Sequence, residues 1–227
     1  MSTATIADVF YPDSDDEPLA ETPAHVDAIL YLLTAIRARF AGREDVYIAA
    51  DSYLYNVENK PKFRKAPDIM VALGTRGRGS RRWFKTWEEG VVPSVIFEVT
   101  SPSTFENDIE GKSNLYAGLG VSEYYLFDPL SQTWDTPLVA LRLVDGEYDK
   151  VDQGPDGGVD SPALGMRLVP DGELLRLVDI ASGRAMSSPD ELVQRVEGAE
   201  RQVAVERSRA DDLAAEVARL KAKYGEV

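Results

Sequence analysis

Two acidic residues and one lysine occupy positions where burial would be costly. Asp68 opens an apolar segment, Glu98 interrupts the most apolar segment of the chain, VIFEVT, and Lys112 lies in the helical pattern that follows. A carboxylate inside an apolar strand needs a partner, a metal ion or a raised pKa. Carboxylates that converge from neighbouring strands form a hard-oxygen site suited to Mg²⁺ or Mn²⁺. A lysine beside such a site can orient a water molecule or stabilise negative charge developing on a phosphate.

Plainer interpretations exist for each of these residues. Asp68 can cap a turn or strand, and Glu98 and Lys112 can form a buried ion pair without a metal. Asp108 lies four residues before Lys112, where a helix-surface pair is the simplest interpretation and a role in the site the second.

A strongly basic segment flanks Asp68 on both sides. Residues 60–85 contain nine basic residues and one acidic residue, a net charge of +8, whereas the whole chain carries −14. The acidic total argues against a generic nucleic-acid or membrane-surface binder, but a local basic segment can still bind phosphates. We predict a mobile loop here with four candidate substrate-binding residues: Arg76, Arg78, Arg81 and Arg82. Three neighbouring aromatic residues could stack on bases, namely Trp83, Phe84 and Trp87. The alternative is a solvated loop that balances an acidic body.

Helical and extended patterns alternate along the chain and indicate a mixed α/β (α+β) fold. Thr22 and Pro23 predict a helix start, which apolar residues follow at helical spacing: Val26, Ile29, Leu30, Leu33, Ile36 and Phe40. A second helix is predicted over 105–119. Strands are predicted over 46–50, 52–57, 68–73, 92–100, 123–127, 166–169 and 174–179, with a hairpin of 138–144 and 147–151 through Asp145-Gly146. The segment 92–100 is nearly continuously apolar, which is typical of a central strand buried on both faces.

The last part of the chain has a heptad pattern. Apolar residues alternate spacings of four and three, with a charged break at Glu206, through positions 192, 196, 199, 203, 206, 210, 213, 217, 220 and 224. This pattern predicts a coiled coil that dimerises the protein. A single helix folded back onto the domain and a partly frayed tail are the alternatives.

Composition sets the domain organisation and excludes several kinds of site. We expect a flexible acidic arm over 1–21, a folded domain over 22–186 and a C-terminal helix over 187–227. The chain has no cysteine and one histidine, His25, which excludes thiolate chemistry, Cys-ligated zinc and poly-His metal sites. A surface or packed position is the leading interpretation of His25, and a place near the site is the second. Without a membrane-spanning stretch or secretory signal, we expect a cytoplasmic protein with no membrane partner.

Several of these motifs, taken in order, resemble the Uma2 family of restriction-endonuclease-like proteins in the PD-(D/E)XK nuclease superfamily. The motifs are Pro67-Asp68, VIFEVTSPS over 95–103, Asp108 with Lys112 and Tyr116, Gly120-Val121, Glu123-Tyr124-Tyr125 and Asp128-Pro129. The resemblance implies a restriction-endonuclease-like mixed central sheet flanked by helices. It also implies Mg²⁺- or Mn²⁺-dependent phosphodiester cleavage, with Asp68 and Glu98 as metal ligands.

The chain departs from the simple superfamily pattern in one place. That pattern puts a lysine two residues after Glu98, where this chain has Thr100. The resemblance assigns the role to Lys112 on the following helix, because one cluster can be reached from either backbone position. Tyr116, one turn later, would hold the lysine, touch substrate or simply pack in the core, and Asp51 would add a further oxygen.

These observations together predict an Mg²⁺-dependent endonuclease that acts on DNA through Asp68, Glu98 and Lys112, as a homodimer. Two alternatives remain open. One is a catalytically inactive nuclease-like binding or scaffold protein dimerised by its coiled coil, and the other is a nuclease that acts on RNA through the same site.

Overall fold

The chain forms two compact units, residues 1–186 and 187–227, and each is described by itself. The computed structural model describes residues 22–76, 79, 81–101, 105 and 107–225. The predicted acidic arm and Arg78 therefore lie outside the described residues.

A six-stranded mixed sheet forms the centre of the first unit. Its spatial order is β1 (Val46–Ala50), β4 (Ile69–Leu73), β6 (Val95–Val99), β7 (Glu123–Phe127), β8 (Leu138–Val144) and β9 (Glu147–Lys150). β6 and β7 run parallel, and the other neighbouring pairs run antiparallel. All five residues of β6 are buried, as predicted for a central strand. The mixed sheet flanked by helices is thereby confirmed.

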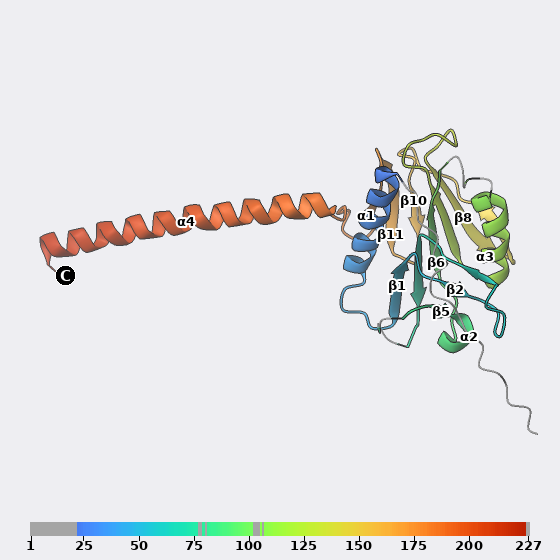
Figure 1. Ribbon diagram of the computed structural model, residues 1–227. Helices are drawn as coiled ribbons and strands as arrows, with labels where there is room; N and C mark the ends of the chain where they lie inside the picture. The colour runs from blue at the N-terminus through green and yellow to red at the C-terminus, as the bar shows by residue number, and fades with distance from the viewer. Residues whose placement is uncertain (1–21, 77–78, 80, 102–104, 106, 226–227) are drawn as a thin grey trace, which may run out of the picture. The chain divides into compact units, whose positions relative to one another are not determined.

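Both faces of this sheet are covered, as Figure 1 shows with α1 and α3 on opposite sides. One face packs against α1 (Pro23–Arg39) and a small sheet of β10 (Val159–Ser161), β11 (Met166–Asp171) and β12 (Leu174–Asp179). The other face packs against α3 (Ser113–Leu119). A second small sheet of β2 (Leu54–Tyr55), β3 (Arg64–Lys65) and β5 (Phe84–Lys85) contributes Leu54 and Phe84 to that second core, and α2 (Thr86–Glu89) follows β5.

Helix α1 begins where the sequence predicts, and its buried face matches the predicted stripe only in part. The Thr22 side chain caps it by accepting a hydrogen bond from the His25 N–H at 3.3 Å. Val26 and Leu30 are exposed, although their spacing placed them on the predicted apolar stripe. The buried face consists of Ala24, Ala28, Tyr31, Leu32, Ala35 and Ile36. Small alanines allow the helix to approach the sheet closely, which apolar spacing alone does not indicate.

Two other predictions need correction. The strand expected over 52–57 contains only Leu54 and Tyr55, because its alternating pattern also suits a loop that buries two side chains. The helix expected over 105–119 is divided, with a π-helix, η1 (Asn107–Lys112), leading into α3. The hairpin prediction is correct. Asp145 and Gly146 join β8 to β9 with φ of 50° and 90°, the left-handed values of a type I′ turn.

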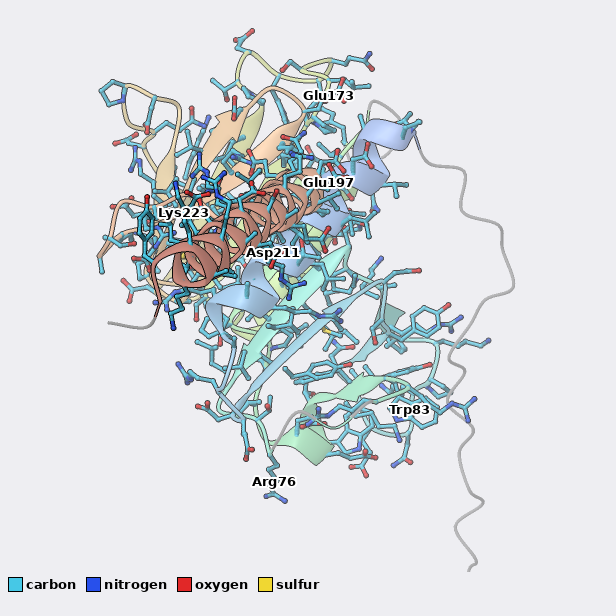
Figure 2. All side chains as sticks on the ribbon, turned by 90° about the vertical axis from the view of Figure 1, so that its left-hand side faces the viewer. Arg76, Trp83, Glu173, Glu197, Asp211 and Lys223 are labelled. Atoms are coloured by element: carbon cyan, nitrogen blue, oxygen red, sulfur yellow. The ribbon has the colours of Figure 1, made fainter. Side chains whose placement is uncertain are left out.

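The second unit is helix α4 (Pro189–Tyr224), 36 residues long. Its start is fixed by a capping box, in which the Ser188 hydroxyl accepts from the Glu191 N–H at 3.2 Å and the Glu191 carboxylate accepts from the Ser188 N–H at 2.7 Å. No residue of α4 is buried. Figure 2 labels three of its charged residues, Glu197, Asp211 and Lys223. Neither α4 nor any other helix in the described part of the chain is long and apolar enough to cross a membrane.

Candidate active site

The pairing of β4 with β6 sets Asp68 opposite Glu98. Ile69 faces Phe97 in this antiparallel register, so the next pair along is Asp68 with Glu98. Directly opposed residues in antiparallel strands project from the same face. The Asp68 Oδ2 accepts a hydrogen bond from the Val99 N–H at 2.6 Å, which ties the aspartate to β6. The register thus brings the two predicted carboxylates together on the face that packs against α3.

Glu98 is almost completely buried and both of its oxygens are occupied. It is 1% exposed. The Tyr116 hydroxyl donates to Glu98 Oε1 at 3.0 Å, and Lys112 Nζ lies 2.9 Å from Glu98 Oε2. Tyr116 therefore holds the glutamate from within the core. The sequence left three roles open, namely contact with the lysine, contact with the substrate and core packing, and the structure shows the packing together with this hydrogen bond. Since Tyr116 is itself fully buried, its hydroxyl orients Glu98 from inside the core.

The π-helix η1 supplies the third carboxylate. Lys112 Nζ lies 2.8 Å from Asp108 Oδ1, and Asp108 is 1% exposed. The Tyr124 hydroxyl on β7 donates to the Asp108 carbonyl oxygen at 2.9 Å. The sequence favoured a surface pair between Asp108 and Lys112, but the structure places both in the buried cluster. Short π-helical segments are frequent at functional sites.

This cluster contains more negative than positive charge. Two carboxylates, those of Glu98 and Asp108, contact the ammonium of Lys112, and a third, that of Asp68, lies opposite Glu98 on the neighbouring strand. Burial raises the pKa of Glu98 to about 8, the charge of Lys112 opposes that rise and the charge of Asp68 adds to it. Burial lowers the pKa of Lys112, but Glu98 and Asp108 more than offset that effect and keep the pKa above its usual value. Lys112 therefore stays protonated, and a further cation near the carboxylates would relieve their repulsion.

The donor set is compatible with a divalent cation that keeps several waters. In the described part of the chain, no three or more His, Asp or Glu side chains are arranged to hold a metal ion. Mg²⁺ is usually bound through one or two carboxylates together with waters and substrate phosphates. Asp68 and Glu98 meet that requirement. The sequence predicted that Asp51 would add a further oxygen to this site. Asp51 directly follows β1 and is exposed, and its N–H donates to the Asp68 carbonyl oxygen at 3.3 Å.

His25 lies beside this cluster, which its position in the sequence did not show. Its Nε2 atom is 3.7 Å from Asp68 Oδ2, and its side chain is 12% exposed. The two residues are far apart in the sequence, and their proximity depends on how the start of α1 packs near β4. The pattern of residues around His25 therefore does not predict its contact with Asp68.

The predicted basic residues do not form one group. The Arg81 Nε and Nη2 atoms donate to Glu89 at 2.5 and 3.0 Å, and its guanidinium stacks on Tyr47. Arg82 stacks on Trp83 at 5.5 Å. In Figure 2, Arg76 and Trp83 lie apart on the rim of the first unit.

The prediction of a base-stacking role is wrong for one of the three aromatic residues. Phe84 is fully buried and stacks on Tyr47, with 5.5 Å between ring centroids. It belongs to the core and cannot stack on a base. Trp83 and Trp87 are partly buried, so parts of both rings reach the surface.

A groove of about 640 Å³ runs along the outer edge of β1 and contains several of these residues. Arg37, Arg81 and Arg82 line it together with Asp51 and Tyr53. One lining residue, Asp51, donates its N–H to the Asp68 carbonyl oxygen, so a single backbone hydrogen bond links the groove to the strand that follows Asp68. The sequence did not single out Arg37, since it lies on α1, away from the basic segment.

Comparison with known proteins identifies what the chain is similar to. The model of the Uma2 family, described as "Putative restriction endonuclease", matches residues 11–170. A search of curated proteins finds no match. Among solved structures, that of "a putative nuclease belonging to DUF820" from Anabaena variabilis ATCC 29413 is similar at 18% identity and a TM-score of 0.48, over 65% of this chain and 76% of that chain. The residues matched by the family model include Asp68, Glu98, Asp108 and Lys112.

Proposed function

The chain belongs to the Uma2 family of restriction-endonuclease-like proteins, and from this premise we propose that it hydrolyses phosphodiester bonds of DNA with a divalent metal ion, Mg²⁺ or Mn²⁺. Asp68 and Glu98 hold the metal, and Lys112 is the third catalytic residue. One observation carries the proposal. Lys112 lies between the buried carboxylates of Glu98 and Asp108, and Asp68 lies opposite Glu98 where β4 begins, in a family described as "Putative restriction endonuclease".

The metal contributes the chemistry that the side chains lack. A bound Mg²⁺ or Mn²⁺ would polarise the phosphate and lower the pKa of a bound water. Asp68 stays oriented for this task through the Val99 N–H. Tyr116 fixes one oxygen of Glu98, so the glutamate reaches the metal with little freedom to rotate.

Lys112 positions the reacting groups. Its ammonium has three N–H donors, and two of them are directed at Glu98 and Asp108. The third can donate to the attacking water or to a phosphate oxygen, where a positive charge stabilises the developing negative charge. Asp108 keeps the ammonium in place and protonated, and it acts as a positioning residue.

The groove along β1 guides the substrate backbone. Arg37 and Arg82 line it next to Asp51, and each arginine can neutralise one phosphate. Arg76 and, from its place in the sequence, Arg78 are proposed as further substrate-binding residues. Because Arg81 is paired with Glu89, we assign it to holding the loop in place as well as to lining the groove.

The test is metal-dependent cleavage of supercoiled plasmid, with single-stranded DNA and RNA in parallel. Glu98→Gln and Asp68→Asn should abolish cleavage and weaken Mn²⁺ binding measured by calorimetry. Glu123→Gln is the matched control, since Glu123 is also a buried glutamate but binds Tyr125 and Ser161 on β7 and β10. That variant should lose stability and retain cleavage.

Each failure has its own meaning. Undiminished cleavage by Glu98→Gln would refute the site. Metal binding at Asp68 and Glu98 without cleavage of any DNA would refute the DNA substrate, and cleavage of RNA alone would reassign it. Absence of both metal binding and cleavage would favour the nuclease-like binding or scaffold protein.

A further inference from the structure

Helix α4 carries an apolar stripe that nothing in its own unit covers. The helix is 36 residues long, about 54 Å at 1.5 Å per residue. Its large apolar side chains are between 43% and 70% exposed: Leu192, Val193, Val196, Val203, Val205, Leu213, Val217, Leu220 and Tyr224. All of these except Val193 and Val205 lie on the heptad seam. A stripe of this kind needs a partner helix of similar length.

The residues of the seam indicate how many helices associate and in which direction they run. In heptad notation the a positions are Val196, Val203, Ala210, Val217 and Tyr224, and the d positions are Leu192, Ala199, Glu206, Leu213 and Leu220. β-Branched residues at a with leucine at d favour a parallel two-stranded coiled coil. Three of the five a residues are valine and three of the five d residues are leucine. We propose that the stripe is covered by α4 of a second copy of this chain, parallel and in register.

Charges beside the seam favour the same direction. In a parallel pair, each g residue faces the e residue of the partner's next heptad. Arg195 then faces the partner's Glu200, and Glu216 faces the partner's Lys221. The two remaining pairs, Gln202 with the partner's Arg207 and Arg209 with the partner's Ala214, bring no like charges together.

The antiparallel arrangement brings like charges together. With Glu206 opposite the partner's Ala210, g residues face g residues and e residues face e residues. Arg209 then meets the partner's Arg209, Arg207 meets the partner's Arg207, and Arg195 meets the partner's Lys223. Beside the seam, the antiparallel pair has three kinds of like-charge contact, where the parallel pair has two kinds of opposite-charge contact. These flanking charges therefore favour the parallel direction.

Glu206 is the one charged residue on the seam, and its neighbours compensate for it. Gln202 donates to its carboxylate at 2.9 Å, and Arg209 Nη1 lies 3.0 Å from the same oxygen. In the parallel pair Glu206 meets the partner's Glu206, and Arg207 of each helix borders this layer from the e position. A polar layer flanked by opposite charges fixes the register at a cost in stability.

The parallel direction joins the two chains at the same end of the coiled coil. Both copies of Ser188, where α4 begins, then lie together. Resting on the proposed function, each dimer then carries two copies of the candidate site. The direction of the helices can be tested without any measurement of cleavage.

The chain has no cysteine, so single cysteines report the direction without background. Ala199→Cys places a thiol at a d position, and oxidation of the full chain should give a covalent dimer on a non-reducing gel. Ser208→Cys, at the outward f position of the same helix, is the matched control and should run at the monomer mass on the same gel. In an antiparallel pair, position 199 would lie opposite 217 and about 27 Å from the partner's position 199, from 18 residues at 1.5 Å each.

Three results would overturn the proposal. The first is that Ala199→Cys fails to cross-link. The second is that Ala199→Cys cross-links only when it is mixed with Val217→Cys, and the third is that the wild-type chain sediments as a monomer at micromolar concentration. Far-UV circular dichroism of each variant verifies that α4 remains helical, so a negative result cannot be attributed to unfolding.

Discussion

Replacing Lys112 by Met should destabilise the protein strongly and in a pH-dependent way. The substitution removes the cation that lies 2.9 Å from Glu98 and 2.8 Å from Asp108. Both carboxylates are 1% exposed, so water cannot replace the lost charge. Removal of one partner from a buried ion pair costs about 3–5 kcal/mol. For a domain of this size that corresponds to a fall in Tm on the order of 10 °C.

The pH dependence follows from the direction of the Glu98 pKa. Burial raises that pKa from 4.5 to about 8 in the folded protein, so the folded state favours protonated Glu98. The stability from the protonated carboxyl is complete below the unfolded pKa and is lost as pH rises towards the folded one. Without Lys112 the folded pKa rises further. The loss of stability in the variant should therefore be smallest at pH about 4.5, where Glu98 is protonated, and largest above pH about 8.

Urea unfolding followed by fluorescence of the three tryptophans measures this effect. Arg43→Met is the control, since Arg43 and Asp45 form an ion pair with both side chains 51% exposed, worth at most about 1 kcal/mol. Addition of Mg²⁺ alone should recover part of the lost stability, because a cation held by Asp68 and Glu98 restores positive charge. A Lys112→Met variant that matches Arg43→Met at every pH would refute the buried cluster. Absence of any Mg²⁺ effect would refute its affinity for metal.

Four further substitutions test other parts of the structure. Tyr116→Phe removes the hydroxyl that donates to Glu98 and should lower the free energy of unfolding by about 1–2 kcal/mol, measured by urea midpoint; an unchanged midpoint would contradict the hydrogen bond. Gly146→Ala, at φ 90° in the β8–β9 turn, should cost about 1 kcal/mol or more. Gly118→Ala in α3, where an added Cβ meets nothing within 4 Å, should instead gain about 0.5–1 kcal/mol; equal effects at both sites would contradict the turn geometry. Ser188→Ala removes the capping box of α4 and should cost about 1 kcal/mol of helix stability, seen as a lower melting temperature by circular dichroism; an unchanged melt would show that the cap is dispensable.

Strong local patterns allowed much of the fold to be predicted from the sequence. β1, β7 and β12 have the predicted bounds, since each is a short apolar run with clear turn signals beside it. The hairpin through Asp145 and Gly146 was equally clear, because few residue pairs adopt two left-handed conformations in succession. The heptad pattern is enough to predict α4, and the capping box at Ser188 marks where the helix begins.

The errors occurred where tertiary packing overrides local pattern. The exposed Val26 and Leu30 and the buried alanines of α1 show that the approach of the sheet selects the face. β3 and β5 have two residues each, too few to show a period. Phe84 follows a basic loop, and only the fold places it against Tyr47.

The candidate site was predictable in its carboxylates and not in its surroundings. Asp68 opens an apolar strand and Glu98 interrupts one. The sequence therefore shows that each carboxylate would be buried among apolar residues, where it needs a partner. Asp108 appeared to be a surface residue because an acidic residue four positions before a lysine is typical of an exposed helix face, whereas η1 packs with Asp108 buried. His25 lies far from Asp68 in the sequence, and a contact of that kind depends on the packing of α1.

The π-helix η1 also bears on how the family can vary by insertion and deletion. A π-helical hydrogen bond spans one residue more than an α-helical one, so η1 holds one residue beyond what a continuous α-helix would need. Gly111 fits inside it because an added Cβ would lie 2.7 Å from Asn107 Oδ1. Loss of a single codon here would let the segment rewind as an α-helix continuous with α3, and the residues before the deletion would turn by about 100° relative to α3. The Tyr124 hydroxyl that binds the Asp108 carbonyl oxygen would then meet a different part of the segment, so the placement of Asp108 depends on the length of η1.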